Sequence, residues 1–373
     1  MNTKDDEYTE DNDNVASFPY LAFTNSYTRV PVVEEFSATA CAWCVRGIAG
    51  LEKLGKEVGN AVRIAAHPKD FNGVPDPLYA ANYDAVIQNY ASNFPFAVVN
   101  REYGGDPYDD VVGMSKSAAA SPCEANLTVK GSKPNNLTGK IKASSEVEFL
   151  FDAPAGAYSV VYVITEDGVQ GVEQQNAYAV LLAQYKKQGL TDEGAFRQMK
   201  IHNNPDLQEI AKAGNPYEPT FNHTAVIVTD GFGGMQPSQL PAIKAGQKIS
   251  HSVEIELPKR TPAIKNSNLS IAALLIDNAS GVVVTGAQAE LGKTSEPSAI
   301  ESVEGNEFAE IEAADGAFTV KADNAKAAVY SVDGKLISSC TVNGQASLPT
   351  FGKGVFVIRV EANGHVMTKK AIF

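Results

Sequence analysis

Several residue types are scarce in this 373-residue sequence, and each scarcity excludes a class of protein. Lys and Arg together number 31 against 44 for Asp and Glu, so the net charge is −13 and no nucleic-acid partner is expected. No apolar run approaches the roughly 20 residues that span a bilayer, so no transmembrane segment is predicted. The hydrophobic fraction of 44% is normal and indicates a folded chain, long enough for two or three domains.

Cysteine is also scarce, with four residues in the whole chain. Two of them, Cys41 and Cys44, stand three positions apart in "TACAWCVRG", whereas Cys123 and Cys340 are isolated and are expected to be small buried side chains or free thiols. A zinc site needs four ligands at suitable spacing, so no metal is predicted. The glycine turn "DGFGG" at 230–234 lacks the following Lys-Ser/Thr of a phosphate-binding loop, and no cofactor is expected.

Residues 29–122 alternate between strand and helix patterns. This alternation predicts an α/β domain with parallel pairing. Strands are expected at 29–36, 61–67 and 96–102, and helices at 45–58, 76–91 and 106–120.

After Pro122 the composition changes to short β-rich runs bounded by Gly, Asn, Asp and Pro. These runs predict an antiparallel β-sandwich over 123–292, interrupted by one helix at 176–189 and a polar loop near 202–216. A linker is expected at 293–306, followed by an all-β sandwich over 307–373 with hairpin turns at Asp333-Gly334 and Asn363-Gly364. The acid-rich residues 1–28 are expected to be a disordered tail. The expected class is therefore α/β plus all-β.

The cysteine pair lies where a strand is expected to pass into a helix. Cys41 would stand at the helix N-terminus and Cys44 one turn inside it. Unpaired N–H groups and the helix dipole at that position favour a thiolate, which is the form that attacks disulfides. The three-residue spacing lets the second sulfur close onto the first and release a mixed disulfide. The pattern thus predicts redox chemistry, with a purely structural disulfide as the alternative.

Three further residues belong to this hypothesis. Glu35 faces the same side of its strand as Val33, and a buried carboxyl there would have a raised pKa and could take the proton of Cys44. Pro95 directly precedes a strand, and a cis proline there could bring backbone groups against the sulfurs and receive a substrate strand. Trp43, between the cysteines, is either a docking residue for a substrate or a locally packed ring.

His67 has two possible interpretations, and His223 has one. His67 follows a central strand and is either at the edge of the active site or an ordinary loop residue. His223 is expected to be a strand residue with a satisfied ring nitrogen.

Residues 30–122 resemble a thioredoxin-fold domain, with C-A-W-C as the redox tetrapeptide. The resemblance implies Cys41 as the attacking thiol, Cys44 as the resolving thiol, Glu35 at the buried-acid position and Pro95 at the cis-proline position. "VEEFSATACAWCVRG" and "NFPFAVVNR" also resemble the Omp-related outer-membrane protein family of Bacteroidetes, as do the later runs "FNHTAVIV" and "AALLIDNASGVVVTGAQAEL". That family combines a thioredoxin-like segment with a β-rich region.

The last 75 residues or so resemble the type A sorting domain of the Bacteroidetes type IX secretion system. The resemblance lies in "VYSVDGK", in "LPTFGKGVFVIRV" with Gly352 and Gly354 flanking Lys353, and in the terminal "TKKAIF". It implies secretion machinery as a partner and a place at the cell surface, outer membrane or periplasm, with an export signal outside this sequence. Disulfides persist in those compartments.

The function expected from the sequence is thiol–disulfide exchange on protein or small thiol substrates. The alternative is a non-catalytic binding or structural protein of the cell surface, in which the CAWC pair is a permanent staple.

Overall fold

The computed structural model describes most of the chain, namely residues 26–134, 139–231, 238–295, 300–301, 309–314, 316–331, 336–351, 355–362 and 365–372. Residues Ser26–Glu301 form one compact unit, and the described residues after Ser302 belong to another. Residues 1–25 of the expected acidic tail lie outside the described residues. Ser26 and Tyr27 form β1 and pair with β15 (Ile300–Glu301), within the expected linker.

Eight described strands of the larger unit form one sheet in the order β14-β13-β10-β11-β3-β2-β6-β7. Pairing is parallel between β2 and β3 and between β3 and β11, and antiparallel elsewhere. The strands are β2 Val32–Phe36, β3 Val62–Ala66, β6 Phe96–Val99, β7 Tyr103–Gly105, β10 Tyr158–Glu166, β11 Thr224–Val228, β13 Leu269–Asp277 and β14 Val283–Glu290.

The ranges 29–122 and 123–292, expected as separate domains, both contribute strands to this sheet. In the strand order the two ranges meet between β3 and β11, where Ala65 and Thr224 are paired in parallel. The physical reason lies in β10, whose residues are all buried on both faces. A strand apolar on both faces needs cover on both sides, which a two-layer sandwich with one solvated face does not provide.

The sheet curls until β14 returns to the ends of β2 and β6. Val283 N donates to Asn100 O at 2.9 Å, and Gly286 N donates to Val30 O at 3.0 Å. Gly286 is required for this approach, because a Cβ there would overlap the side chain of Val32 and touch Val62. The inside of the curl is an apolar core built from both halves of the unit, including Phe36, Ile64, Val163 and Leu274.

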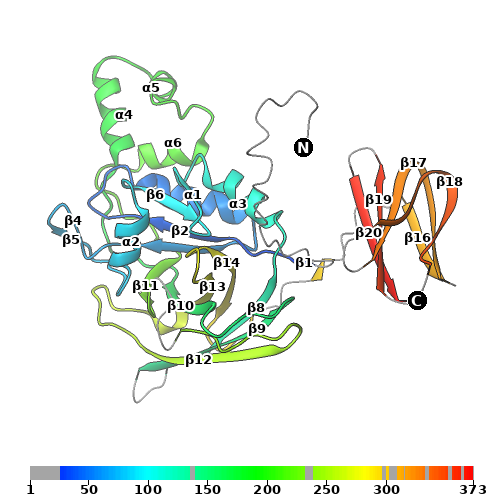
Figure 1. The fold of residues 1–373 in the computed structure, drawn as a ribbon. Coiled ribbons are helices and arrows are strands. Elements are labelled where there is room, and N and C mark those ends of the chain that lie inside the picture. The colour runs from blue at the N-terminus through cyan, green and yellow to red at the C-terminus, as the bar shows by residue number, and fades with distance from the viewer. Residues whose placement is uncertain are drawn as a thin grey trace, which may run out of the picture. The chain divides into compact units, whose positions relative to one another are not determined.

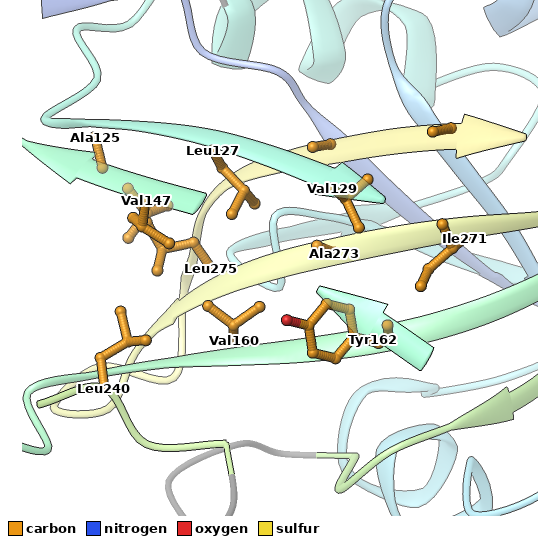
Figure 2. Close-up of a cluster of buried hydrophobic side chains, with 14 of the residues drawn as sticks. Ala125, Leu127, Val129, Val147, Val160, Tyr162, Leu240, Ile271, Ala273 and Leu275 are labelled. Atoms are coloured by element: carbon orange, nitrogen blue, oxygen red, sulfur yellow. The ribbon is translucent and has the colours of Figure 1, made fainter. Parts of the chain in front are cut away.

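Two layers cover the outside of the curl (Figure 1). Helices α1 (Val45–Glu57) and α3 (Val111–Ala119) pack over β2, β3 and β6. A three-stranded sheet of β8 (Ala125–Gly131), β9 (Lys140–Phe149) and β12 (Lys248–Glu256) packs over β10, β13 and β14. Figure 2 shows Leu127 and Val129 of β8 facing Tyr162 and Ile271 across this core. The unit thus combines an α/β part with a β-sandwich part, as the sequence predicted.

An insertion of three helices separates β10 from β11. They are α4 (Ala177–Lys187), α5 (Asp192–Gln198) and α6 (Pro205–Lys212). The first matches the helix expected at 176–189, with Asn176 as its N-cap. Helix α6 falls in the stretch near 202–216 that was expected as a polar loop, and α5 lies between that stretch and α4, where no helix was expected. They fold because α6 buries Leu207 and Ala211, and α5 buries Phe196, in a small core shared with Val45 of α1.

The helix expected at 76–91 is shorter, and α2 spans Asp84–Tyr90. Before it, Asp76 caps its own turn by accepting from Leu78 N, and Ala80 N and Ala81 N donate to the sheet at His67 O and Val226 O. Backbone N–H groups that bond to the sheet are not available for helix hydrogen bonds. A two-stranded hairpin, β4 (Asp70–Phe71) and β5 (Val74–Pro75), precedes this segment.

The C-terminal unit is a five-stranded sheet over the residues described there, in which β17 pairs with β16, β18 and β19, and β19 pairs with β20. The long strand β17 bends at a bulge near Asn324, so its two halves enclose a core with Phe318, Val329 and Ile358. The expected turns at 333–334 and 363–364, and the Gly352–Gly354 segment, lie outside the described residues. The strands are β16 Ala309–Ala314, β17 Ala317–Ser331, β18 Leu336–Pro349, β19 Val355–Ala362 and β20 His365–Ile372.

Candidate functional site

Cys41 and Cys44 form a disulfide at the junction of β2 and α1. Helix α1 begins at Val45 with Cys44 as its N-cap, and Cys44 N donates to Cys41 O in the turn that precedes it. The helix thus begins at Val45 as expected, but Cys41 lies in the preceding turn and Cys44 is the N-cap instead of lying one turn inside the helix. Both sulfurs still lie at the end of α1 where the helix dipole favours negative charge.

The disulfide is almost enclosed. Cys41 is 5% exposed and Cys44 fully buried, and together with Ala38 they form a small cluster against Phe71 and Phe94. Phe71 comes from the β4–β5 hairpin, and Phe94 precedes Pro95, whose peptide bond is cis. The expectation of a cis proline before β6 thus agrees with the geometry, and Cys41 is enclosed in this disulfide-bonded form.

Residues 174–177 of the insertion form a strap across the cysteine loop. The buried Gln174 side chain donates from Nε2 to Cys41 O at 2.9 Å and to Ala38 O at 3.3 Å. Gln175 N donates to Thr39 O at 3.0 Å, and Ala177 N donates to Ala42 O at 2.8 Å. The strap holds the loop in one conformation and contributes to the burial of Cys41. No sequence signal marked Gln174, because its partners are backbone atoms more than 130 positions away.

Glu35 is buried on the side of β2 that faces α1, as its spacing from Val33 predicted. Its carboxyl lies against Gly47, one turn after Cys44, where a Cβ would overlap Oε1. Burial raises the pKa of Glu35 to about 8, the Ser37 side chain opposes that rise through a hydrogen bond, and the charge of Asp106 adds to it. A carboxyl that titrates near neutral pH can accept and return a proton beneath the cysteine turn.

His67 is a buried residue paired with Asp76, which neither alternative for it anticipated. His67 Nδ1 lies 3.1 Å from Asp76 Oδ1, and Asp76 Oδ2 accepts from Thr39 N at 2.7 Å. Burial alone would raise the pKa of Asp76, but the His67 ring and the N–H groups of Thr39 and Leu78 hold it below its usual range. This network fixes the start of the cysteine loop. His223 directly precedes β11, so it is not the strand residue that was expected. Its Nδ1 lies 3.3 Å from Asp167 Oδ1 without forming a hydrogen bond among the described residues, so this ring nitrogen is not satisfied as expected.

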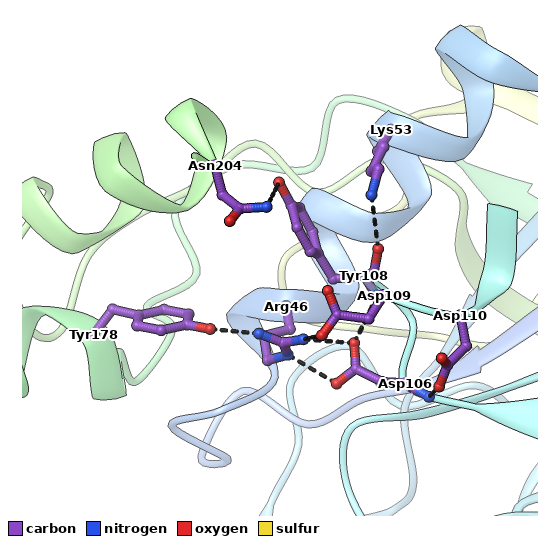
Figure 3. Close-up of polar contacts among 8 residues, drawn as sticks. All are labelled: Arg46, Lys53, Asp106, Tyr108, Asp109, Asp110, Tyr178 and Asn204. Carbon is purple, nitrogen blue, oxygen red and sulfur yellow. Dashed lines mark hydrogen bonds and ion pairs between the residues drawn. The ribbon is translucent and has the colours of Figure 1, made fainter. Parts of the chain in front are cut away.

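Arg46 joins α1 to two other segments (Figure 3). Its guanidinium binds both carboxylate oxygens of Asp106 at 2.8 Å, donates to Asp109 at 2.6 Å and donates to the Tyr178 hydroxyl of α4 at 2.5 Å. The adjacent Trp43 is 46% exposed and packs edge to face on Tyr178 at 5.3 Å. Trp43 thus lies toward the insertion.

The remaining cysteines are free thiols. Cys123 is fully buried, as expected, and burial raises its pKa. Among the described residues, no three His, Cys, Asp or Glu side chains lie together so as to hold a metal ion. In the same part of the chain, no helix is both long and apolar enough to cross a membrane.

Comparison with known proteins gives structural likenesses at low identity. No protein-family model matches the sequence, and no curated protein matches it. The chain is similar to HBP35 of Porphyromonas gingivalis, with 17% identity, TM-score 0.48, and coverage of 94% of this chain and 99% of that one. It is also similar to a protein of Agrobacterium tumefaciens, with 16% identity, TM-score 0.37, and coverage of 71% and 96%. These likenesses assign neither a family nor a function.

Proposed function

We propose that the larger unit carries a thioredoxin-like domain that performs thiol–disulfide exchange through Cys41 and Cys44. In the oxidised state, a substrate thiolate attacks Cys41 Sγ, the Cys41–Cys44 bond breaks, and Cys44 leaves as the thiolate. A second substrate thiol then attacks the substrate sulfur of the mixed disulfide, and Cys41 leaves. The two electrons pass from the substrate dithiol to the protein disulfide, and the reverse sequence reduces a substrate disulfide.

The observation that carries the proposal is the buried Glu35 carboxyl beneath the cysteine turn. A structural disulfide needs no titratable group, and burying a carboxyl without an ion-pair partner costs free energy. With a pKa of about 8, Glu35 can give its proton to the leaving Cys44 thiolate and take it back when the disulfide re-forms. Glu35 and Cys44 act as the proton-exchanging pair, and Cys41 as the attacked sulfur.

The topology around the pair supports the same proposal. Parallel β2 and β3, antiparallel β6 and β7, and the following α3 give the order strand–helix–strand, then two strands and a helix, expected of a thioredoxin-like domain. Pro95 leads into β6, whose Phe96 pairs with Phe36 at the end of β2 nearest the cysteine loop. In the proposal Pro95 and Trp43 flank the substrate.

We also propose that the protein works outside the cytoplasm, at the cell surface, in the outer membrane or in the periplasm. The closed disulfide supports this, because disulfides persist in oxidising compartments. The all-β C-terminal unit would be the sorting module that contacts the secretion machinery, as its sequence resemblance implies. Membership of the Omp-related family belongs to the same proposal.

The second candidate is a non-catalytic surface protein in which the disulfide is structural. The enclosure of Cys41 by Phe71, Phe94 and the 174–177 strap favours it, because a catalytic sulfur must meet its substrate. Under this alternative the strap never opens.

A trapping experiment separates the two. In Cys44→Ser, the remaining Cys41 thiolate should attack a disulfide of oxidised insulin, release the other insulin sulfur as a thiolate and stay joined to the chain in a stable mixed disulfide. Mass spectrometry should detect this adduct in Cys44→Ser and not in Cys41→Ser. Cys340→Ser is the matched control, since Cys340 is a free thiol in the other unit. If wild type and Cys41→Ser reduce insulin at the same rate, only the structural alternative remains.

A further inference from the structure

A pocket of about 470 Å³ opens beside the cysteine loop, between the start of α1 and the inserted helices. Its aromatic wall consists of Trp43, Tyr178 and Tyr185, and its apolar floor includes Leu181 and Met199. A pocket of this volume is in the range that accepts a small molecule or one to two amino-acid side chains. Residues of the insertion supply most of its lining, and neither Glu35 nor Pro95 is part of it.

Two of the three charged residues that line the pocket, Arg46 and Asp109, are paired with each other, and the third is the exposed Lys200. Arg46 binds both oxygens of Asp106, one oxygen of Asp109 and the Tyr178 hydroxyl (Figure 3). Its guanidinium therefore has its hydrogen-bond partners within the protein and forms part of the pocket wall. Asn204, at the far side, donates to the Tyr108 hydroxyl at 3.2 Å. Because Arg46 is already paired and the walls are aromatic and aliphatic, the pocket favours an apolar group over an ion.

The position of Trp43 indicates which kind of molecule carries the apolar group that the pocket accepts. Trp43 is two residues from Cys41, so their α-carbons are at most about 7.6 Å apart. An extended polypeptide advances about 3.3 Å per residue. A chain joined to Cys41 through one of its cysteines therefore has side chains two to four positions away within reach of the pocket. Exposed aromatic rings such as Trp43 are also typical anchors of peptide recognition.

We infer that this pocket binds an aromatic or long aliphatic side chain of a polypeptide substrate, close in sequence to the cysteine that exchanges with Cys41. The inference rests on the proposed function and narrows its substrates to polypeptides with an apolar residue near the reactive cysteine. Small thiols exchange without using the pocket.

Trp43 makes the test direct, because it is the sole tryptophan of the chain and lines the pocket. A blocked hexapeptide with S-methylcysteine and, three positions away, phenylalanine is titrated while Trp43 emission is recorded. S-methylation prevents exchange, so binding is measured apart from chemistry. We expect a saturable change in emission, and dissociation about tenfold weaker when serine replaces the phenylalanine, the loss of one well-packed anchor.

Two variants change the pocket without touching the disulfide. Leu181→Gln and Met199→Gln should each weaken binding of the phenylalanine peptide by about tenfold, since both partly exposed side chains line the floor. Val180→Gln is the matched control, because Val180 is 40% exposed on the same helix and lines a different hollow.

Any of three results would overturn the inference. They are Trp43 emission that does not change on titration, equally tight binding of the phenylalanine and serine peptides, and a weakening of binding by Val180→Gln as large as that by Leu181→Gln and Met199→Gln. Insulin exchange through Cys41 without such binding would overturn the inference alone and leave the proposed function. Binding without trapping in Cys44→Ser would support the pocket as a peptide site and remove the proposed chemistry.

Discussion

The carboxyl of Glu35 lies against the α-carbon of Gly47, with its Oε1 in the space that a Cβ would occupy. The strand that carries Glu35 and the helix that carries Gly47 are joined by the cysteine loop. A glycine at this position of α1 therefore makes room for a buried acid one turn after Cys44. Two predictions follow from this pair.

Replacing Gly47 by alanine should destabilise the oxidised protein by about 1–3 kcal/mol, because the new methyl group must displace the buried carboxyl of Glu35. Urea denaturation of the oxidised variant measures the change. Gly113→Ala is the control, since a Cβ at that position of α3 meets nothing within 4 Å. The double variant Gly47→Ala/Glu35→Ala should recover part of the loss, and a loss that Glu35→Ala leaves undiminished would show that the two residues do not compete for space.

Replacing Glu35 by glutamine should remove a pH dependence. The pKa of Glu35 is about 8 in the folded protein and about 4.5 when exposed, so between these values the folded state holds a proton that the unfolded chain has released. Stability should therefore fall as pH rises through this window, by at most about 1.4 kcal/mol per pH unit. Below pH 4.5 Glu35 is protonated in both the folded and the unfolded state, so its full contribution to the free energy of unfolding is present there.

The measurement is the difference in unfolding free energy between wild type and Glu35→Gln at pH 5 and at pH 8.5. We expect glutamine to gain relative to the wild type at the higher pH. Glu209→Gln, at an exposed position of α6, should show no such trend. If Glu35 is the proton acceptor of Cys44, exchange should also slow by at least about a hundredfold.

Replacing Gln174 by alanine should speed reduction of the disulfide by dithiothreitol. The change removes two hydrogen bonds from the strap to the cysteine loop, at Ala38 O and Cys41 O, each contributing about 1 kcal/mol. A strap that opens more often admits the reductant more often. Gln170→Ala, an exposed residue of the same insertion, should leave the rate unchanged. Equal rates for wild type and both variants would mean that the strap does not limit access.

Replacing Arg101 by methionine should destabilise the larger unit by about 3–5 kcal/mol. Arg101 is fully buried and binds both carboxylate oxygens of Glu34 at 2.7 and 2.8 Å inside the curl of the sheet. Its loss leaves Glu34 buried, and among the residues that the structure describes the Tyr83 hydroxyl, at 2.7 Å, is the side-chain partner that remains. Thermal unfolding measures the effect. The double variant Glu34→Leu/Arg101→Met should unfold at a higher temperature than Arg101→Met, since it removes the unpaired charge.

The sequence predicted best where a signal is local. The spacing of Val45, Leu51 and Leu54 predicted α1, and period-two alternation placed Val33 and Glu35 on the same face of β2. It predicted poorly where a segment is stabilised by distant partners. Residues 76–83 have an apolar pattern that favours a helix, but their N–H groups bond to His67 and Val226. Helix α6, in an Asn-rich stretch, forms because Leu207 packs with residues of α1 and α4.

At the candidate site, the sequence determined the chemistry that is available, namely two cysteines three positions apart at the start of a helix and an acid six positions before the first. Covalent spacing and strand periodicity depend only on neighbours in the chain, so they can be read without coordinates. The tertiary structure decided that the disulfide is closed, that Gln174 covers it, that Asp76 fixes the loop and that Trp43 faces a pocket of the insertion. Most of these features depend on contacts between segments that are far apart in the sequence, by more than 130 residues for Gln174 and Cys41. Packing, not local sequence, determines which distant segments meet.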